Sequence, residues 1–337
     1  MKSRIASSLI QQFTKRDDTV YDPFSGSGSI AFEAWIAHRH IVANDLSPYA
    51  TLLTRAKLSP YRTIETALAD IESSQRLVNE AQKCVDLRSV PAWVRDFFHP
   101  ETLREAIAWT IVLREHNHEF LLACLLGILH HQRPGFLSYP SSHTVPYLRI
   151  KLFPKHQFPE LYGYRSVADR LEKKVRRALS NIPKLDFSVR RRVVSRDAAT
   201  HAPRCIEAII TSPPYMRQLD YARDNRLRLW FLGCSNWKPL DARISPTEDG
   251  FLQLMTRCLY LWRRVLTPRG KCIFVLADTC SRASNVSLPD IILRLATKSV
   301  GGYRLIGVHR EEIPGIRRVR RGLRGSTAET FLVLERV

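Results

Sequence analysis

The spacing of apolar residues predicts alternating strands and helices in the first sixty residues. Apolar side chains recur every three or four positions over 3–14, 28–38 and 47–58, as in a helix that buries one face. Short apolar runs at 18–22 and 40–45 lie between these helices and predict strands. Helices that alternate with strands cover a parallel sheet, so this segment reads as a first β-α-β half.

The same alternation returns near the end of the chain. Apolar runs at 189–195, 205–211 and 271–276 predict three more strands, and a closing pair follows at 303–308 and 330–334. We therefore expect an α/β fold with a doubly wound, Rossmann-like sheet.

Residues 60–188 interrupt the alternation. Helical periodicity dominates at 63–82, 101–116, 118–131 and 164–180, whereas 132–160 is rich in Pro, His, Ser and aromatic residues with basic residues among them. The predicted organisation is one domain built from 1–59 and 189–337, with a largely helical insertion at 60–188.

The turn after the first strand contains Asp22-Pro23-Phe24-Ser25-Gly26-Ser27-Gly28 and opens a helix. Glycines there allow a tight turn and close approach of the backbone to a ligand at the helix N-terminus. Asp45 follows the next strand, about 20 residues further on, where doubly wound folds place the carboxylate that binds a ribose diol. The glycine spacing alone would also suit a nicotinamide-binding domain or a turn without a ligand.

A second turn, Thr211-Ser212-Pro213-Pro214-Tyr215, follows the strand at 205–211. Two consecutive prolines form a stiff, extended segment whose carbonyl groups point outward. Hydroxyl and carbonyl oxygens could accept hydrogen bonds from the exocyclic amine of a base while Tyr215 stacks on its ring. The alternative is a structural turn in which Tyr215 packs locally.

Together, the two turns resemble those of the S-adenosylmethionine-dependent amino-methyltransferases of DNA, which methylate cytosine N4 or adenine N6. Ser195-Arg196-Asp197-Ala198 and the turn at 266–270 resemble further elements of that family. The resemblance covers 3–58 and 189–337 and implies a mostly parallel sheet with an antiparallel last strand. It also implies S-adenosyl-L-methionine as the cofactor, with a catalytic turn formed by Ser212, Pro213, Pro214 and Tyr215. The implied cofactor-binding residues are Asp22, Pro23, Phe24, Gly26, Gly28, Asp45 and Asp197.

Ser212 bears on the target base. Serine at this position resembles the cytosine-N4 group, whereas adenine-N6 enzymes more often carry Asp or Asn, so we expect methylation of cytosine N4 in a flipped base. Adenine N6, an RNA base N-methyltransferase and a non-catalytic DNA-binding relative are the alternatives. The implied partners are double-stranded DNA and a cognate restriction endonuclease.

Charge supports a nucleic-acid partner. The 337 residues carry a formal net charge of +20, which favours binding to a polyanion. The seven cysteines form no Cys-x-x-Cys pair and no His, Cys or Asp cluster has metal-ligand spacing, so we expect no metal. No apolar run reaches membrane-spanning length and the chain begins without a signal-peptide pattern, which predicts a cytoplasmic protein without a membrane partner.

Basic residues in three places are candidate contacts to nucleic acid. One group follows the catalytic turn, where open α/β sheets bind ligands, and one lies between the closing strands. The third lies in the insertion, which we interpret as a target-recognition region, although a solvated helix face explains the lysines at 173 and 174 equally well. The candidates are Arg217, Arg223, Arg226, Arg133, Lys173, Lys174, Arg317, Arg318, Arg320 and Arg321.

Overall fold

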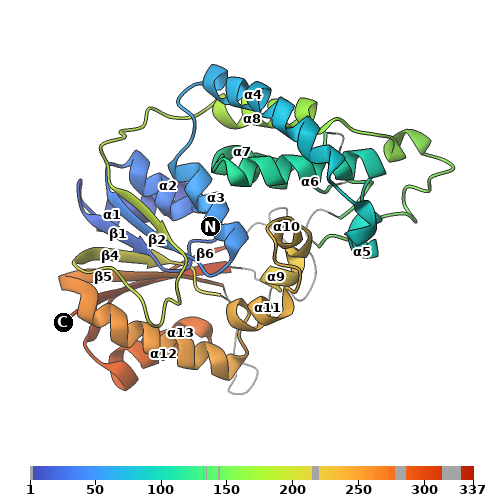
Figure 1. Cartoon of the computed structure of the whole chain (residues 1–337). Coiled ribbons are helices and arrows are strands. Elements are labelled where there is room, and N and C mark those ends of the chain that lie inside the picture. Colours follow the sequence, from blue (N-terminus) through green and yellow to red (C-terminus); the bar gives the residue numbers. More distant parts are fainter. Residues whose placement is uncertain are drawn as a thin grey trace. The chain divides into compact units, whose positions relative to one another are not determined.

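The computed structural model describes residues 3–131, 133, 135–142, 145–214, 220–277, 286–312 and 328–337. The chain forms two compact units, which we call the sheet unit and the helical unit (Figure 1). The sheet unit consists of Met1–Thr54, Lys184–Leu219 and Ala242–Val337, and the helical unit consists of Arg55–Pro183 and Asp220–Asp241.

In the described parts of the chain, seven strands form one sheet in the order β3-β2-β1-β4-β5-β7-β6. Strands β1 to β5 pair in parallel, whereas β7 is antiparallel to both β5 and β6. This confirms the predicted α/β class, including the antiparallel last strand. The strands are β1 (Thr19–Asp22), β2 (His40–Asn44), β3 (Arg191–Val194), β4 (Ile206–Thr211), β5 (Leu266–Ala277), β6 (Tyr303–Glu312) and β7 (Ala328–Arg336).

Helices cover both faces of this sheet (Figure 1). α1 (Ser3–Phe13) and α2 (Ser29–Ile36) pack together on one side, and α12 (Glu248–Val265) and α13 (Leu288–Arg294) lie on the other. α12 buries Phe251, Met255 and Trp262, which recur at helical spacing and pack against sheet residues in one apolar cluster. α3 (Pro48–Leu58) begins in the sheet unit, and the six residues of η3 (Leu295–Val300) follow α13.

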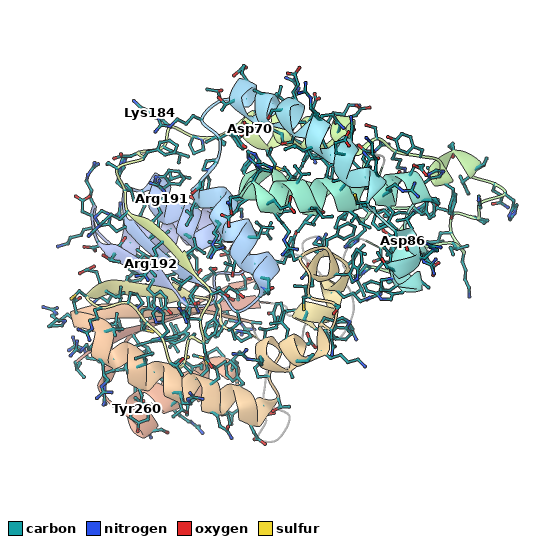
Figure 2. All side chains as sticks on the ribbon, viewed as in Figure 1. Asp70, Asp86, Lys184, Arg191, Arg192 and Tyr260 are labelled. Atoms are coloured by element: carbon teal, nitrogen blue, oxygen red, sulfur yellow. The ribbon has the colours of Figure 1, made fainter. Side chains whose placement is uncertain are left out.

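The edge strand β3 is basic. Arg191 lies over the ring of Trp35, 4.2 Å from its centroid, and Figure 2 shows Arg191 and Arg192 on this strand. Charged side chains on an edge strand oppose pairing with a second sheet. Residues 266–270, which were expected to form a turn before the fifth strand, belong to β5, which begins at Leu266 and pairs irregularly with β4.

The core of the helical unit contains the helices α4 (Ile64–Lys83), α6 (Pro100–Glu115), α7 (Glu119–Gly127) and α8 (Val167–Leu179). α4 packs against α6 and α8, and α7 packs against α8. α8 buries Val167, Leu171, Val175 and Leu179 on one face, so its basic residues lie on the others. Shorter elements complete the unit: η1 (Leu87–Ser89), α5 (Ala92–Arg95) and η2 (Pro159–Tyr162), with α11 (Lys238–Ile244) at its boundary.

The spacing of Tyr221, Leu227, Leu229 and Trp230 predicts a single helix after the Thr211–Tyr215 turn. The structure has two short helices there, α9 (Tyr221–Asp224) and α10 (Arg226–Phe231). They belong to the helical unit, which therefore contains 220–241 in addition to most of the predicted insertion at 60–188. The reason is burial, because the ring of Phe231 packs edge-on against Phe98 with centroids 6.1 Å apart.

Candidate active site

The two turns identified in the sequence follow neighbouring strands. β1 and β4 pair in parallel, with Val20 opposite Ala208 and Tyr21 opposite Ile209. The strand order reverses between these two strands, and ligands of open α/β sheets bind at the carboxyl edge of such a switch point. Asp22 and Ser212 therefore begin their turns side by side at the edge where a ligand is expected.

Asp22 is buried, with only 2% of its surface exposed. Its Oδ1 accepts a hydrogen bond from the Thr211 hydroxyl at 2.8 Å and another from the Phe24 backbone N–H at 3.3 Å. Burial raises the pKa of Asp22 to about 7, against the lowering effect of these two hydrogen bonds. A carboxyl group that titrates near neutral pH responds strongly to a positive charge placed beside it.

The two glycines of the first turn serve different purposes. Both have positive φ, +52° at Gly26 and +73° at Gly28. A Cβ on Gly28 would lie 2.9 Å from the hydroxyl of Thr54, so this glycine lets the start of α2 pack closely against α3. A Cβ on Gly26 would meet nothing within 4 Å. The space beside Gly26 is open, as a loop that approaches a ligand requires.

Asp45 follows β2 and holds the same loop. Its Oδ2 accepts from the backbone N–H of Gly26 at 2.8 Å, and its Oδ1 accepts from Ser47 N–H at 2.8 Å. Desolvation raises the pKa of Asp45, and these backbone hydrogen bonds act in the opposite direction. Each oxygen can accept a further hydrogen bond, so the carboxylate can still bind a diol.

Asn44, which was not among the predicted site residues, lies between two of them. It is 1% exposed, and its amide nitrogen donates to the carbonyl groups of Pro23 at 3.0 Å and Arg196 at 2.9 Å. Its Oδ1 accepts from the backbone N–H of Arg196 at 2.8 Å. Asn44 thus joins the first turn to the segment that carries Asp197. Its place directly before Asp45 at a strand end was the available signal.

The aromatic residue of the first turn lies at the edge of the core. The Phe24 ring is partly buried and packs edge-on against Trp262, with centroids 6.2 Å apart. In the segment that Asn44 joins to the first turn, the Asp197 carboxylate accepts a hydrogen bond from the backbone N–H of Ala199 at 2.9 Å. The predicted cofactor residues therefore surround the carboxyl ends of β1, β2 and β3.

The Thr211–Tyr215 turn, the predicted catalytic turn, is described as far as Pro214. Pro213 is buried, whereas Ser212 and Pro214 are half-buried. The Thr211–Asp22 hydrogen bond ties the start of this turn to the first one. Tyr215 lies outside the described residues, as do Arg217, Arg317, Arg318, Arg320 and Arg321.

Two of the predicted nucleic-acid contacts have partners within the helical unit. Arg223 forms an ion pair with Asp220, and its Nε lies 3.9 Å from Asp224. Arg226 donates to the carbonyl of Pro146 and lies over the ring of Trp93, 5.8 Å from its centroid. Part of the hydrogen-bonding capacity of both arginines is therefore used inside the protein.

The other described candidates lie on the surface of the helical unit. Arg133 and Lys173 are exposed, and Lys174 is half-buried, with the end of its aliphatic chain 3.6 Å from where a Cβ on Gly127 would be. Within the described parts of the chain, no group of three His, Cys, Asp or Glu side chains could hold a metal ion. No helix among those residues is long and apolar enough to span a bilayer.

The strand order and the antiparallel β7 define the Rossmann-like fold of S-adenosylmethionine-dependent methyltransferases. Residues 1–122 match the family model of the D12 class N6 adenine-specific DNA methyltransferases. The match includes the first turn, Asn44 and Asp45, and it ends before the second turn at Thr211–Tyr215. Both the fold and the matched family imply S-adenosylmethionine as the cofactor. No curated protein matches the chain in sequence.

Three of the solved structures to which the chain is similar are the following. TrmN from Thermus thermophilus is 12% identical with a TM-score of 0.39, and the alignment covers 100% of this chain but 49% of TrmN. A TehB-like SAM-dependent methyltransferase from Corynebacterium glutamicum is 10% identical, with a TM-score of 0.37 and coverage of 98% and 87%. The rRNA methyltransferase aviRa from Streptomyces viridochromogenes is 12% identical, with a TM-score of 0.35 and coverage of 99% and 85%. The chain thus spans about half the length of TrmN.

Proposed function

We propose that this protein is a DNA methyltransferase that transfers a methyl group from S-adenosylmethionine to the exocyclic amine of adenine. The observation that carries the proposal is the position of Ser212-Pro213-Pro214 beside the Asp22–Gly28 turn at the switch point of the sheet. The target base follows the family that residues 1–122 match. Adenine N6 therefore replaces cytosine N4, which we expected from Ser212, as the proposed target of methylation.

The residues around the first turn suit the cofactor. S-adenosylmethionine supplies a methyl group already activated by its sulfonium charge. Asp22, with a pKa near 7, would balance positive charge on the ligand, and Asp45 would accept from the ribose hydroxyls. The open space beside Gly26 leaves room for the ligand, while Asn44 holds the turn in place.

Two more residues complete the proposed cofactor site. Phe24 would lie along the ligand and Asp197 would accept from the adenine amine, as the family resemblance implies. Asn44 fixes the backbone of Arg196 by two hydrogen bonds, so the chain beside Asp197 has a defined position.

The catalytic turn would act on the base. The Ser212 hydroxyl and the Pro213 carbonyl would accept hydrogen bonds from the amine, which makes the nitrogen lone pair available to the methyl group. As the N–C bond forms, the S–C bond would break to leave neutral S-adenosylhomocysteine, and the amine would lose its proton to water. Tyr215 would stack on the flipped base. Correct positioning of the two reactants can supply about 7–11 kcal/mol of the barrier reduction.

Cytosine N4 is the second candidate, and Ser212 is the observation that favours it. A hydroxyl group stands where adenine-N6 enzymes more often carry Asp or Asn. The family match ends before this position, so it does not bear on the residue that touches the base.

Incubation with tritiated S-adenosylmethionine and duplex DNA or RNA tests the proposal. Hydrolysis of labelled DNA should release N6-methyladenine, whereas N4-methylcytosine would establish the second candidate. Label in RNA alone would overturn the DNA assignment. Cofactor binding without transfer would identify a non-catalytic relative, and no binding would refute the whole proposal.

Ser212→Ala tests the site itself. It should reduce methyl transfer at least tenfold while cofactor binding, measured by calorimetry, stays within twofold of wild type. Ser73→Ala is the matched control, because that hydroxyl is exposed on α4 and donates only to the Asp70 carbonyl of its own helix. Equal transfer rates for the two variants would show that the Ser212 hydroxyl has no role in methyl transfer.

We further propose that the helical unit recognises the target sequence. The exposed Arg133 and Lys173 would contact phosphates, which position the protein without reading bases. Reversing the charge of either residue should weaken binding to all duplexes and reduce the salt dependence of the affinity.

A cognate restriction endonuclease stays a prediction, tested by whether DNA methylated by this enzyme resists an endonuclease from the same cells.

A further inference from the structure

Strand β4 is apolar along its buried length but ends in a hydroxyl group. Ile206, Ala208, Ile209 and Ile210 are fully buried, and Thr211, equally buried, follows them directly before the catalytic turn. Valine would fill the same volume and suits a strand at least as well. A buried hydroxyl at this position therefore needs an explanation other than packing.

The partner of this hydroxyl group lies at the end of the neighbouring strand, β1. The Thr211 hydroxyl donates to Asp22 Oδ1 at 2.8 Å, although the two residues are 189 positions apart in the chain. Both side chains are excluded from water, at 0% and 2% exposure, so neither can exchange this hydrogen bond for one to solvent. The contact joins the last residue of β4 to the first residue of the cofactor turn.

We propose that Thr211 is a positioning residue that couples the charge on Asp22 to the placement of the Ser212-Pro213-Pro214 turn. An ionised carboxylate accepts a stronger and shorter hydrogen bond than a neutral carboxyl group does. A ligand that places positive charge beside Asp22 would therefore tighten the Thr211 hydrogen bond and fix the adjacent turn. The inference rests on the proposed function, because it needs a cationic cofactor at this site.

The surroundings of Asp22 allow this response. Burial keeps its pKa near 7, so the charge on the group is sensitive to its neighbours at neutral pH. Asp45, at the end of β2, raises this pKa by repulsion, while the Thr211 hydroxyl and the Phe24 N–H lower it. Tyr21 precedes Asp22 on β1, and burial, with smaller contributions from Cys258 and Asp22, raises its own pKa beyond the range where it would ionise.

Two substitutions separate the hydrogen bond from the packing. Thr211→Val keeps the shape and removes the hydroxyl, and Thr211→Ser keeps the hydroxyl and removes one methyl group. Binding of S-adenosylmethionine would be measured by calorimetry from pH 5.5 to 9, together with kcat and KM for DNA. Thermal unfolding of each variant would show that it is folded.

Loss of a hydrogen bond to a charged group should lower kcat of Thr211→Val by about tenfold or more, with little change in KM for DNA. The pH below which cofactor affinity declines should move upward in Thr211→Val, because the hydroxyl no longer lowers the pKa of Asp22. Thr211→Ser should restore both quantities to within about twofold of wild type. The neutral product S-adenosylhomocysteine, which lacks the sulfonium charge, should show a smaller difference between wild type and Thr211→Val than S-adenosylmethionine does.

The outcomes distinguish the inference from the proposed function. If wild type does not bind S-adenosylmethionine, the proposed function fails. If wild type binds and methylates but Thr211→Val matches it in kcat and in pH profile, Thr211 has no positioning role. If Thr211→Ser is as defective as Thr211→Val, the methyl group and not the hydroxyl is what matters, and the inference is equally wrong.

Discussion

Asp22 should destabilise the cofactor-free protein at alkaline pH, and Asp22→Asn tests this directly. Burial raises the pKa of this carboxyl from 3.8 to about 7, so ionisation inside the fold is unfavourable. Asparagine keeps a side-chain oxygen that can accept from the Thr211 hydroxyl and the Phe24 N–H but never ionises. The substitution therefore removes the charge and retains the hydrogen-bond acceptor.

The direction and size of the effect follow from proton linkage. Because the folded-state pKa is raised, folding takes up a proton between pH 3.8 and about 7. The stability contributed by this uptake is present below pH 3.8 and is lost as pH rises through about 7. A difference of about three pKa units corresponds to about 4 kcal/mol, of which about 3 kcal/mol is lost between pH 5 and pH 8.

The assay is thermal or urea unfolding of cofactor-free wild type and Asp22→Asn at pH 5 and pH 8. Relative to wild type, the midpoint of unfolding of Asp22→Asn should be higher at pH 8 than at pH 5, by about 5 °C or more. It should also bind S-adenosylmethionine at least tenfold more weakly at pH 8, because it lacks the charge that would balance the ligand.

Asp17→Asn is the control. Asp17 is an exposed carboxylate 3.9 Å from Arg16 Nε, and its positive φ of 67° suits asparagine. This variant should follow the pH dependence of wild type. If Asp22→Asn also follows it, with the same stability difference at pH 5 and pH 8, the reasoning about buried charge at Asp22 is refuted.

Further predictions concern the turns and the helical unit. Gly28→Ala should lower stability by about 2 kcal/mol or more, since it combines a positive φ with contact at 2.9 Å to Thr54, and calorimetric unfolding would measure this. Gly26→Ala should lower the free energy of unfolding by only about 1 kcal/mol but weaken S-adenosylmethionine binding, because its methyl group would enter the open space. An equal loss of stability in both glycine variants would contradict this difference between the two glycines. Asn44→Ala removes three hydrogen bonds of a buried amide. It should destabilise the sheet unit by about 2–3 kcal/mol in urea titration and raise the Kd for the cofactor in calorimetry. Arg165→Ala should make the helical unit more susceptible to proteolysis, because this guanidinium donates to the carbonyl groups of Phe136, Ser138 and Leu161; wild-type resistance would show that those contacts contribute little.

Several elements could be predicted from sequence because their signals are local. The helix at 47–58 and the strand at 40–45 were expected from side-chain periodicity, and α3 and β2 agree with them to within a residue. Proline and glycine in the turn after β1 restrict the backbone wherever they occur, so the loop could be anticipated as well. Each of these signals arises from residues a few positions apart.

The segment at 220–241 shows where local signals fail. Its periodicity correctly indicated helix, but nothing in it indicated which unit it would join. Phe231 decides this through burial and its contact with Phe98, more than a hundred residues earlier in the chain. The partners of Arg223 and Arg226 depend on the same placement, so their use within the protein could not be foreseen.

By itself, the sequence determined the order of strands and helices, the two turns at strand ends and the positive charge of the chain. Only the tertiary structure decided that Asn44 holds two segments together and that Thr211 donates to Asp22. It also decided the pKa of Asp22, because that pKa depends on the exclusion of water by surrounding strands. Periodicity fixes the direction of a side chain along its own element, whereas hydrogen bonds and desolvation depend on what long-range packing places next to it.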